Sequence, residues 1–190
     1  MKQAKVLTDA ELKRVLAVVA QAPHAQRNRI ALLLSHYAGL RVGEIASLRW
    51  GDLLDGEGWI RAQFYLLAEN TKTNEARAVH LNARLLKELV AYKSCFKQEI
   101  RAGVPLIASQ KRGHFSANSL CQLFSRMYRQ AGIAGASSHS GRRWFITRLA
   151  HSGISPKVIM TLAGHRSLAT TQRYIDVNDE LLAAAVEVLN

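Results

Sequence analysis

The chain is poor in residues that would tie a fold together through disulfides or metals. Only two cysteines occur among its 190 residues, Cys95 and Cys121, and they do not stand at a short paired spacing. We therefore expect buried, reduced thiols rather than a disulfide or a zinc pair. No HExxH pair and no phosphate-binding GxxxxGK[ST] loop occurs. The sequence thus predicts neither a metal nor another cofactor.

Long apolar runs and acidic residues are also scarce. No stretch approaches the roughly 18 apolar residues of a membrane span, and the N-terminus lacks a signal-peptide core. We therefore expect a cytoplasmic protein without membrane contact. Asp and Glu number 14 against 26 Lys and Arg, which gives a net charge of +12. This excess favours a polyanionic partner such as nucleic acid, with a cationic protein of scattered charge as the alternative.

The residues that are present suffice for a core, since 48% are hydrophobic. Helical spacing of apolar residues predominates, beginning with a capping box at Thr8 in a helix that ends by Pro23. Further helices are expected over Ala25–Ala38, Arg41–Leu48, Ala83–Ala102, Ala117–Ala131, Ser140–His151, Ser155–Ala163, Leu168–Ile175 and Glu180–Leu189. Two strands, Trp59–Leu67 and Ala76–Leu81, form a hairpin with a polar loop. The sequence predicts one domain over residues 1–190, mainly helical with a small antiparallel sheet (α+β).

Four short segments carry side chains suited to phosphate chemistry. They are Gly39–Glu44 with Arg41, His139–Arg142, Gly164-His165 and Tyr174. A phosphodiester can be cleaved without a metal if cations neutralise its non-bridging oxygens, and the arginine fork does this at any working pH. Tyrosine, with a pKa of about 10, needs a base or nearby cations before it attacks. The leaving oxygen needs a proton donor.

These segments resemble the conserved boxes of tyrosine recombinases, the phage integrase family. Residues 39–50, GLRVGEIASLRW, are similar to the first catalytic-arginine box, and HSGR at 139–142 is similar to the HxxR box. LAGHRS at 162–167 resembles the LGH box, and TTQRY at 170–174 resembles the nucleophile segment. Order and spacing agree over about residues 8–189. A single HxxR would be weak, whereas four boxes in register are specific.

The resemblance implies a role for each matching residue. Arg41 and Arg142 would clamp the scissile phosphate. Tyr174 would attack it, forming a 3′-phosphotyrosyl link and releasing a 5′-hydroxyl. His139 would act as general base or proton shuttle, and His165 would hydrogen-bond the phosphate.

Two more residues match the family pattern outside the main boxes. Lys72, in the polar hairpin loop, would protonate the leaving 5′-oxygen. Glu44 occupies the acidic position after the first arginine and would support the site without taking part in the chemistry. The HxxR box departs from the usual HxLRH, because Gly141 and Arg143 replace the leucine and the second histidine. Arg143 would then add a phosphate contact.

The resemblance implies a site-specific DNA recombinase or integrase that is encoded by a bacterium, a phage or another mobile genetic element. Four protomers would act on double-stranded DNA, and a protomer free in solution would be a monomer. Because the first box arrives at Arg41, we expect the N-terminal core-binding and arm-binding domains to be absent from this chain, either as in short recombinases of the fimbrial-inversion type or because the chain is an excised catalytic domain. The helix expected over Glu180–Leu189 would dock on a neighbouring protomer or fold back on its own core.

Two other functions are compatible with parts of the sequence. A type IB topoisomerase uses similar tyrosine chemistry but relaxes supercoils as a monomer. A non-catalytic helix-turn-helix regulator would account for Pro156–Ala163 and Leu168–Ile175 flanking a turn at Gly164. It leaves Arg41, Lys72 and His139 unexplained. Each site residue also has an ordinary explanation: a surface cation, a helix cap or a core tyrosine.

Overall fold

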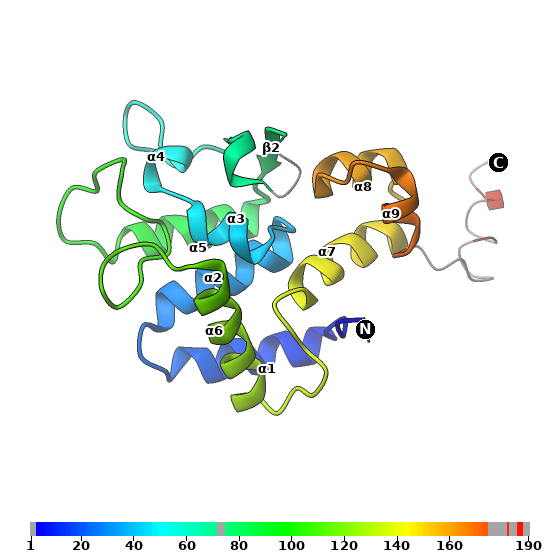
Figure 1. The fold of residues 1–190 in the computed structure, drawn as a ribbon, viewed down its shortest axis with the longest axis horizontal. Coiled ribbons are helices and arrows are strands. Elements are labelled where there is room, and N and C mark those ends of the chain that lie inside the picture. Colours follow the sequence, from blue (N-terminus) through cyan, green and yellow to red (C-terminus); the bar gives the residue numbers. More distant parts are fainter. Residues whose placement is uncertain (1–2, 72–74, 175–181, 183–185, 188–190) are drawn as a thin grey trace.

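The computed structural model describes residues 3–71, 75–174, 182 and 186–187. Within these ranges the chain is mostly helical with a two-stranded antiparallel sheet, which confirms the predicted fold class (Figure 1). The elements are α1 (Asp9–Ala20), α2 (Ala25–Tyr37), α3 (Val42–Ser47), α4 (Trp50–Leu53), β1 (Gln63–Leu66), η1 (Ala68–Asn70, a 3-10 helix), β2 (Arg77–His80), α5 (Ala83–Lys93), α6 (Ala117–Gln130), α7 (Ser140–His151), α8 (Pro156–Ala163) and α9 (Leu168–Gln172). In this described part, no helix is long and apolar enough to cross a membrane.

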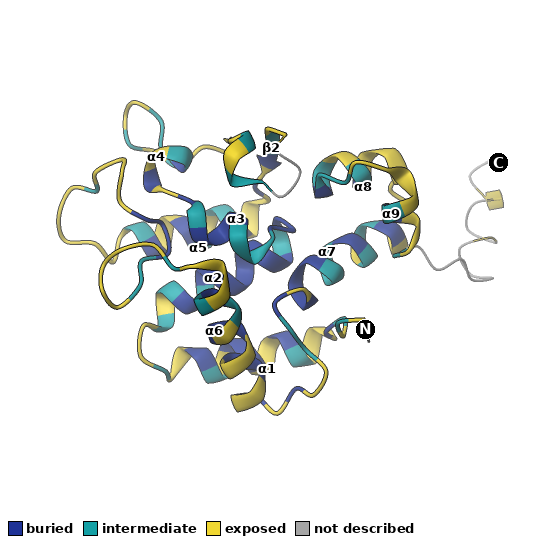
Figure 2. Ribbon diagram, in the orientation of Figure 1, coloured by how far each residue is buried: buried dark blue, intermediate teal, exposed yellow. Residues whose placement is uncertain are grey.

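Helix α2 lies at the centre of the molecule. It packs against α1, α5 and α7, and its residues 30–36 are all buried (Figure 2). A helix buried on every side needs no polar face. The sequence predicted only one apolar face here, so α2 is more deeply enclosed than its periodicity indicated.

Helix α1 begins as predicted. The Thr8 hydroxyl accepts from the Glu11 amide at 3.2 Å, and the Glu11 carboxylate accepts from the Thr8 amide at 3.0 Å. This capping box satisfies two backbone donors that the first turn would leave unpaired. The helix ends at Ala20, before Pro23.

The hairpin is shorter than predicted, and its register pairs Phe64 with Val79. Burial alternates along β1, so Phe64 and Leu66 enter the core while Tyr65 faces outward. The short elements α4 and η1 were not predicted, because a single helical turn carries no periodicity to recognise.

The helix predicted over Ala83–Ala102 is wrong in its second half. It ends at Lys93, where Phe96 turns back and meets Trp50 edge-on at 5.4 Å between ring centroids. This aromatic contact replaces further helical burial. Cys95 therefore lies beyond the helix and is exposed, which contradicts the predicted burial of both cysteines; Cys121 is partly buried, and both are free thiols.

A smaller apolar cluster lies apart from the main core. It consists of Ile146 and Ala150 from α7 with Ile159 and Ala163 from α8, and Tyr174 packs against it. Helix α7 thus connects the main core to the segment that carries the predicted nucleophile.

Two predictions fall outside the described residues. One is Lys72. The other is the helix over Glu180–Leu189, of which only Leu182, Val186 and Glu187 are described, all three exposed.

Candidate active site

Arg41 occupies the N-cap of α3, directly after the turn that ends α2. Gly39 makes this turn in the left-handed region at φ 63°. Glu44, whose side chain is 1% exposed, accepts from the Arg41 amide and from its Nη1, both at 2.8 Å. Arg41 Nη2 donates to the carbonyl of Gly164 at 3.1 Å. The guanidinium is therefore held between two distant segments and is not a free surface cation.

Arg142 lies in the first turn of α7 and is almost fully buried. Its Nη1 donates to the Gly39 carbonyl at 2.7 Å, and its Nη2 donates to the Ala163 carbonyl at 2.5 Å. Burial, followed by the like charge of Arg41, lowers the pKa of Arg142 to about 9. The side chain thus remains a cation at neutral pH, enclosed and pointing at the same segment as Arg41.

His165 follows Gly164, which ends α8 in the left-handed region at φ 62°. Its Nδ1 lies 2.9 Å from the hydroxyl of the buried Thr171. Burial, and next the cations Arg142 and Arg41, lowers the pKa of His165 to about 4. The imidazole is therefore neutral at pH 7. A tautomer in which Nδ1 accepts from Thr171 leaves the proton on Nε2, which can then donate a hydrogen bond.

Tyr174 is partly buried just beyond α9. Its ring stacks on His165 at 5.9 Å between centroids and 21° between planes. On another side, Cζ of Arg143 lies 5.9 Å from the ring centroid, and Arg143 Nη1 donates to the carbonyl of Ala4 at 3.0 Å. The phenol is thus placed between an imidazole and a guanidinium, with its ring against the smaller apolar cluster.

One cavity of about 750 Å³ brings these groups together. His139, at the N-cap of α7, is exposed and lines this cavity; its side chain does not cap the helix. The lining residues are Gln3, Ala4, Lys5, Arg41, Ala134, Gly135, Ser137, His139, Arg142, Arg143, His165, Thr170, Arg173 and Tyr174. Among the described residues, this lining contains lysine and arginine but no aspartate or glutamate. The cavity suits a polyanion.

The structure therefore collects five predicted site residues in one cavity: Arg41, His139, Arg142, His165 and Tyr174. Glu44 lies immediately behind Arg41. Lys72 lies outside the described residues, so its position is not part of this geometry.

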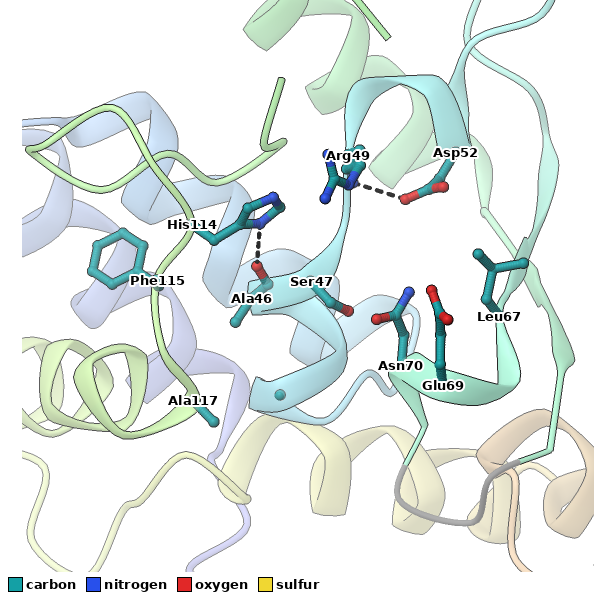
Figure 3. A pocket seen from close by; sticks show the side chains of 11 residues that line it. Ala46, Ser47, Arg49, Asp52, Leu67, Glu69, Asn70, His114, Phe115 and Ala117 are labelled. Atoms are coloured by element: carbon teal, nitrogen blue, oxygen red, sulfur yellow. Dashed lines mark hydrogen bonds between the residues drawn. The ribbon is translucent and has the colours of Figure 1, made fainter. Parts of the chain in front are cut away.

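A second, smaller cavity of about 350 Å³ lies at α3 and contains none of the predicted site residues. Figure 3 shows His114 turned toward the carbonyl of Ala46, with Asp52 and Glu69 also in the lining. Two carboxylates make this cavity unsuitable for a phosphate. The cationic cavity remains the candidate active site.

Sequence reasoning missed several residues that build the site. Thr171 was seen only as part of the nucleophile segment, although its position three residues before Tyr174 places it on the same face of the chain. Residues 3–5 form one wall of the cavity, and no sequence pattern indicates this. Arg77 on β2 was not singled out, yet it is paired with Glu44 in the interior.

The chain was compared with known proteins. The model of the Phage integrase family matches residues 5–180. The chain belongs to this family. Among its relatives, tyrosine recombinase XerA of Thermococcus kodakarensis is 31% identical over 183 residues, covering 96% of this chain and 62% of the relative. Tyrosine recombinase XerD of Neisseria meningitidis is 28% identical, with the same two shares.

Solved structures of similar proteins share the fold of this phage integrase family chain. The crystal structure of XerA recombinase has a TM-score of 0.75 at 23% identity, covering all of this chain and 65% of that one. The Tn1549 transposon integrase in complex with a circular intermediate DNA has a TM-score of 0.78 at 21% identity, covering 98% and 66%. The chain thus spans less than two thirds of the length of these relatives.

Proposed function

We propose that this chain carries the catalytic centre of a site-specific DNA recombinase that cuts and rejoins strands through Tyr174. The observation that supports it most is the cationic cavity in which Tyr174, His165 and the arginines Arg41 and Arg142 meet. Membership of the phage integrase family favours the same activity. The proposed partner is double-stranded DNA, and the proposed assembly on DNA is a tetramer.

The arginines would act first, on the scissile phosphate. Both line the cavity, and the planar guanidinium carries five N–H donors, so each arginine has donors beyond those already bound to protein acceptors. His165, neutral with its proton on Nε2, would donate a further hydrogen bond to a non-bridging oxygen. These donors are fixed before DNA binds, so they stabilise the pentacoordinate transition state without reorganising.

Tyr174 would then attack the phosphorus. A bond forms between its Oη and phosphorus while the bond to the 5′-oxygen breaks. The phenolic proton would pass to His139, and Lys72 would give a proton to the leaving 5′-oxygen. The product is a 3′-phosphotyrosyl link and a 5′-hydroxyl. Because the link retains the energy of the phosphodiester, attack by a second 5′-hydroxyl reseals the strand without a nucleotide.

The structure disfavours a helix-turn-helix regulator. The second helix of such a motif must lie exposed in the major groove. Here α9 has only five residues, and the end of α8 is held by Arg41 and Arg142. The turn at Gly164 leads directly to His165, which lines the cavity.

The covalent intermediate offers a direct test. The chain would be mixed, in EDTA, with a pool of nicked duplexes whose sequence is randomised around the nick, so that cleavage releases a short strand and traps the adduct. We expect an SDS-resistant protein–DNA adduct, lost in Tyr174→Phe and retained in Tyr65→Phe, since Tyr65 is exposed on β1. Absence of adduct in the wild type, or its persistence in Tyr174→Phe, contradicts the proposal. Relaxation of arbitrary supercoiled plasmid by a monomer would instead favour a topoisomerase.

A further inference from the structure

Three arginines converge on the last turn of α8. Arg77 Nη1 donates to the carbonyl of Leu162 at 2.9 Å, and Arg142 and Arg41 donate to the next two carbonyls, those of Ala163 and Gly164. The last carbonyls of a helix have no partner within the helix, and they lie at the negative end of its dipole. Each of these carbonyls is thus matched by one cation.

Two of these arginines are the proposed phosphate clamp and line the cavity, whereas Arg77 is not among the residues that line it. It projects from β2, its side chain is 9% exposed, and its Nη2 donates to Glu44 Oε2 at 2.9 Å. The other oxygen of Glu44 accepts from Arg41 Nη1. Arg77 therefore holds both the carboxylate that orients Arg41 and the helix end that precedes His165.

Gly164 independently shows how closely Arg77 fits this corner. A Cβ built on Gly164 would lie 2.5 Å from Cδ of Arg77 and 2.7 Å from its Nε. Those distances are too short for any side chain. The corner is therefore shaped around the Arg77 side chain as well as by the left-handed backbone.

We propose that Arg77 is a positioning residue of this active site: by binding Glu44 and the Leu162 carbonyl, it aligns Arg41 and His165 before DNA arrives. This inference rests on the proposed function for its kinetic consequence. The position of Arg77 between Glu44 and Leu162 is seen in the structure and does not depend on the proposed activity. Arg77 would touch neither DNA nor the reacting atoms.

The charge of Arg77 gives the proposal a spectroscopic signature. Burial is the main cause that lowers the pKa of His165, and the neighbouring arginines, Arg77 among them, lower it further. An Arg77→Met variant keeps the length and apolar volume of the side chain but removes this charge and both hydrogen bonds. The pKa of His165 is then expected to rise, as measured by NMR titration of the imidazole without DNA.

The kinetic test measures single-turnover adduct formation with a saturating concentration of a nicked duplex that the wild type cleaves, chosen from the randomised pool described above. We expect Arg77→Met to cleave roughly 10- to 100-fold more slowly while DNA affinity stays close to that of the wild type, because a small misalignment of reacting groups has effects of this size. Arg77→Lys, which keeps the charge but lacks the fork, should be intermediate. Arg29→Met is the matched control, because Arg29 forms a partly buried pair with Glu88 away from the cavity.

The possible results distinguish a failure of the positioning role from a failure of the proposed function. Wild-type cleavage by Arg77→Met, a rate loss no larger than that of Arg29→Met, or an unchanged His165 pKa would overturn the positioning role. If Arg77→Met does not fold, Arg77→Lys carries the same comparison. If the wild type forms no adduct, the proposed function fails, and the His165 titration still decides whether Arg77 acts on this corner.

Discussion

At the scale of single residues, two left-handed glycines supply the carbonyls that fix the two clamp arginines. Gly39 accepts from Arg142, and Gly164 accepts from Arg41. Both adopt a positive φ, which an L side chain tolerates poorly. Both positions therefore require glycine for two reasons: the positive φ of the backbone, and the lack of room for a Cβ atom.

Replacing Gly164 by alanine should damage the site more than its backbone alone requires. The left-handed conformation costs about 1 kcal/mol for alanine, and the added Cβ would displace Arg77. Gly132→Ala is the control, since Gly132 has φ 63° and nothing within 4 Å of a built Cβ. Urea unfolding should show a larger stability loss for Gly164→Ala. Equal stability losses in the two variants would show that the Arg77 side chain moves aside without a cost in stability.

His36 predicts how stability depends on pH. It is fully buried on α2, its Nδ1 lies 2.8 Å from the Leu32 carbonyl, and burial lowers its pKa from 6.5 to about 4. Below about pH 6.5, His36 therefore binds a proton in the unfolded chain, whereas in the folded chain it stays neutral down to about pH 4. Folding stability should fall as pH drops from about 6.5 to about 4, with His36 contributing about 3 kcal/mol to the fall.

His36→Asn checks this assignment, because asparagine keeps a donor for the Leu32 carbonyl and does not titrate. Its urea-unfolding free energy should depend less on pH between 7 and 4.5 than that of the wild type. Some dependence remains, since the lowered pKa of His165 acts in the same direction. An unchanged slope would mean that His36 is protonated in the folded state.

At the scale of secondary-structure elements, α7 is the member that joins core to site. It packs on α2, contacts α8 and carries Arg142 in its first turn. Gly141 allows the close approach, because a Cβ there would lie 2.5 Å from Oγ of Ser35. In this chain, therefore, the position has no room for a side chain.

Gly141→Ala should therefore destabilise the protein, although alanine is the better helix former by about 1 kcal/mol. Overpacking against α2 should cost about 1–3 kcal/mol. Gly43→Ala in α3 is the matched helical control, with only the Cβ of Ala117 at 3.9 Å. Thermal or urea unfolding measures both. A stabilised Gly141→Ala would refute the proposed close contact.

The sequence predicted elements best where a local signal specifies them. The Thr8 capping box, the run Ser140–His151 and the turn at Gly164 appear as expected, because caps and glycines act within a few residues. The helix expected to reach Ala102 ended at Lys93, since Phe96 found a partner in Trp50, far away in the chain. Packing between distant segments cannot be read from periodicity.

The candidate site likewise contains residues that the sequence predicted and residues that it did not. Its boxes were recognisable because Arg41, Arg142, His165 and Tyr174 stand in short ordered motifs. Arg77 was not, because its partners Glu44 and Leu162 become neighbours only when β2 meets α3 and α8. A buried ion pair between remote segments leaves no pattern in one sequence.

At the scale of the whole molecule, the chain carries a net charge of +12, and the cavity is lined by Lys5, Arg143 and Arg173 as well as the two clamp arginines. A cleft lined by cations attracts and orients a polyanion. Under the proposed function, the positive charge would attract the DNA, and the fold would determine where its scissile phosphate is held.

Affinity for duplex DNA should accordingly fall steeply with salt. Each phosphate neutralised contributes about −0.9 to the slope of log K against log salt. Arg173→Gln, in the cavity lining, should weaken binding and make the slope shallower by about one contact. Lys97→Gln, exposed elsewhere, should change neither in the same gel-shift series. Equal effects of the two substitutions would indicate diffuse attraction only.

The central claim is that Tyr174 itself becomes linked to DNA. Mass spectrometry of the tryptic peptide from the trapped adduct tests it most directly, since it identifies both the residue and the polarity of the link. The account predicts a 3′-phosphonucleotide on Tyr174 and a free 5′-hydroxyl on the released strand. Attachment to another residue, or through a 5′-phosphate, would contradict it.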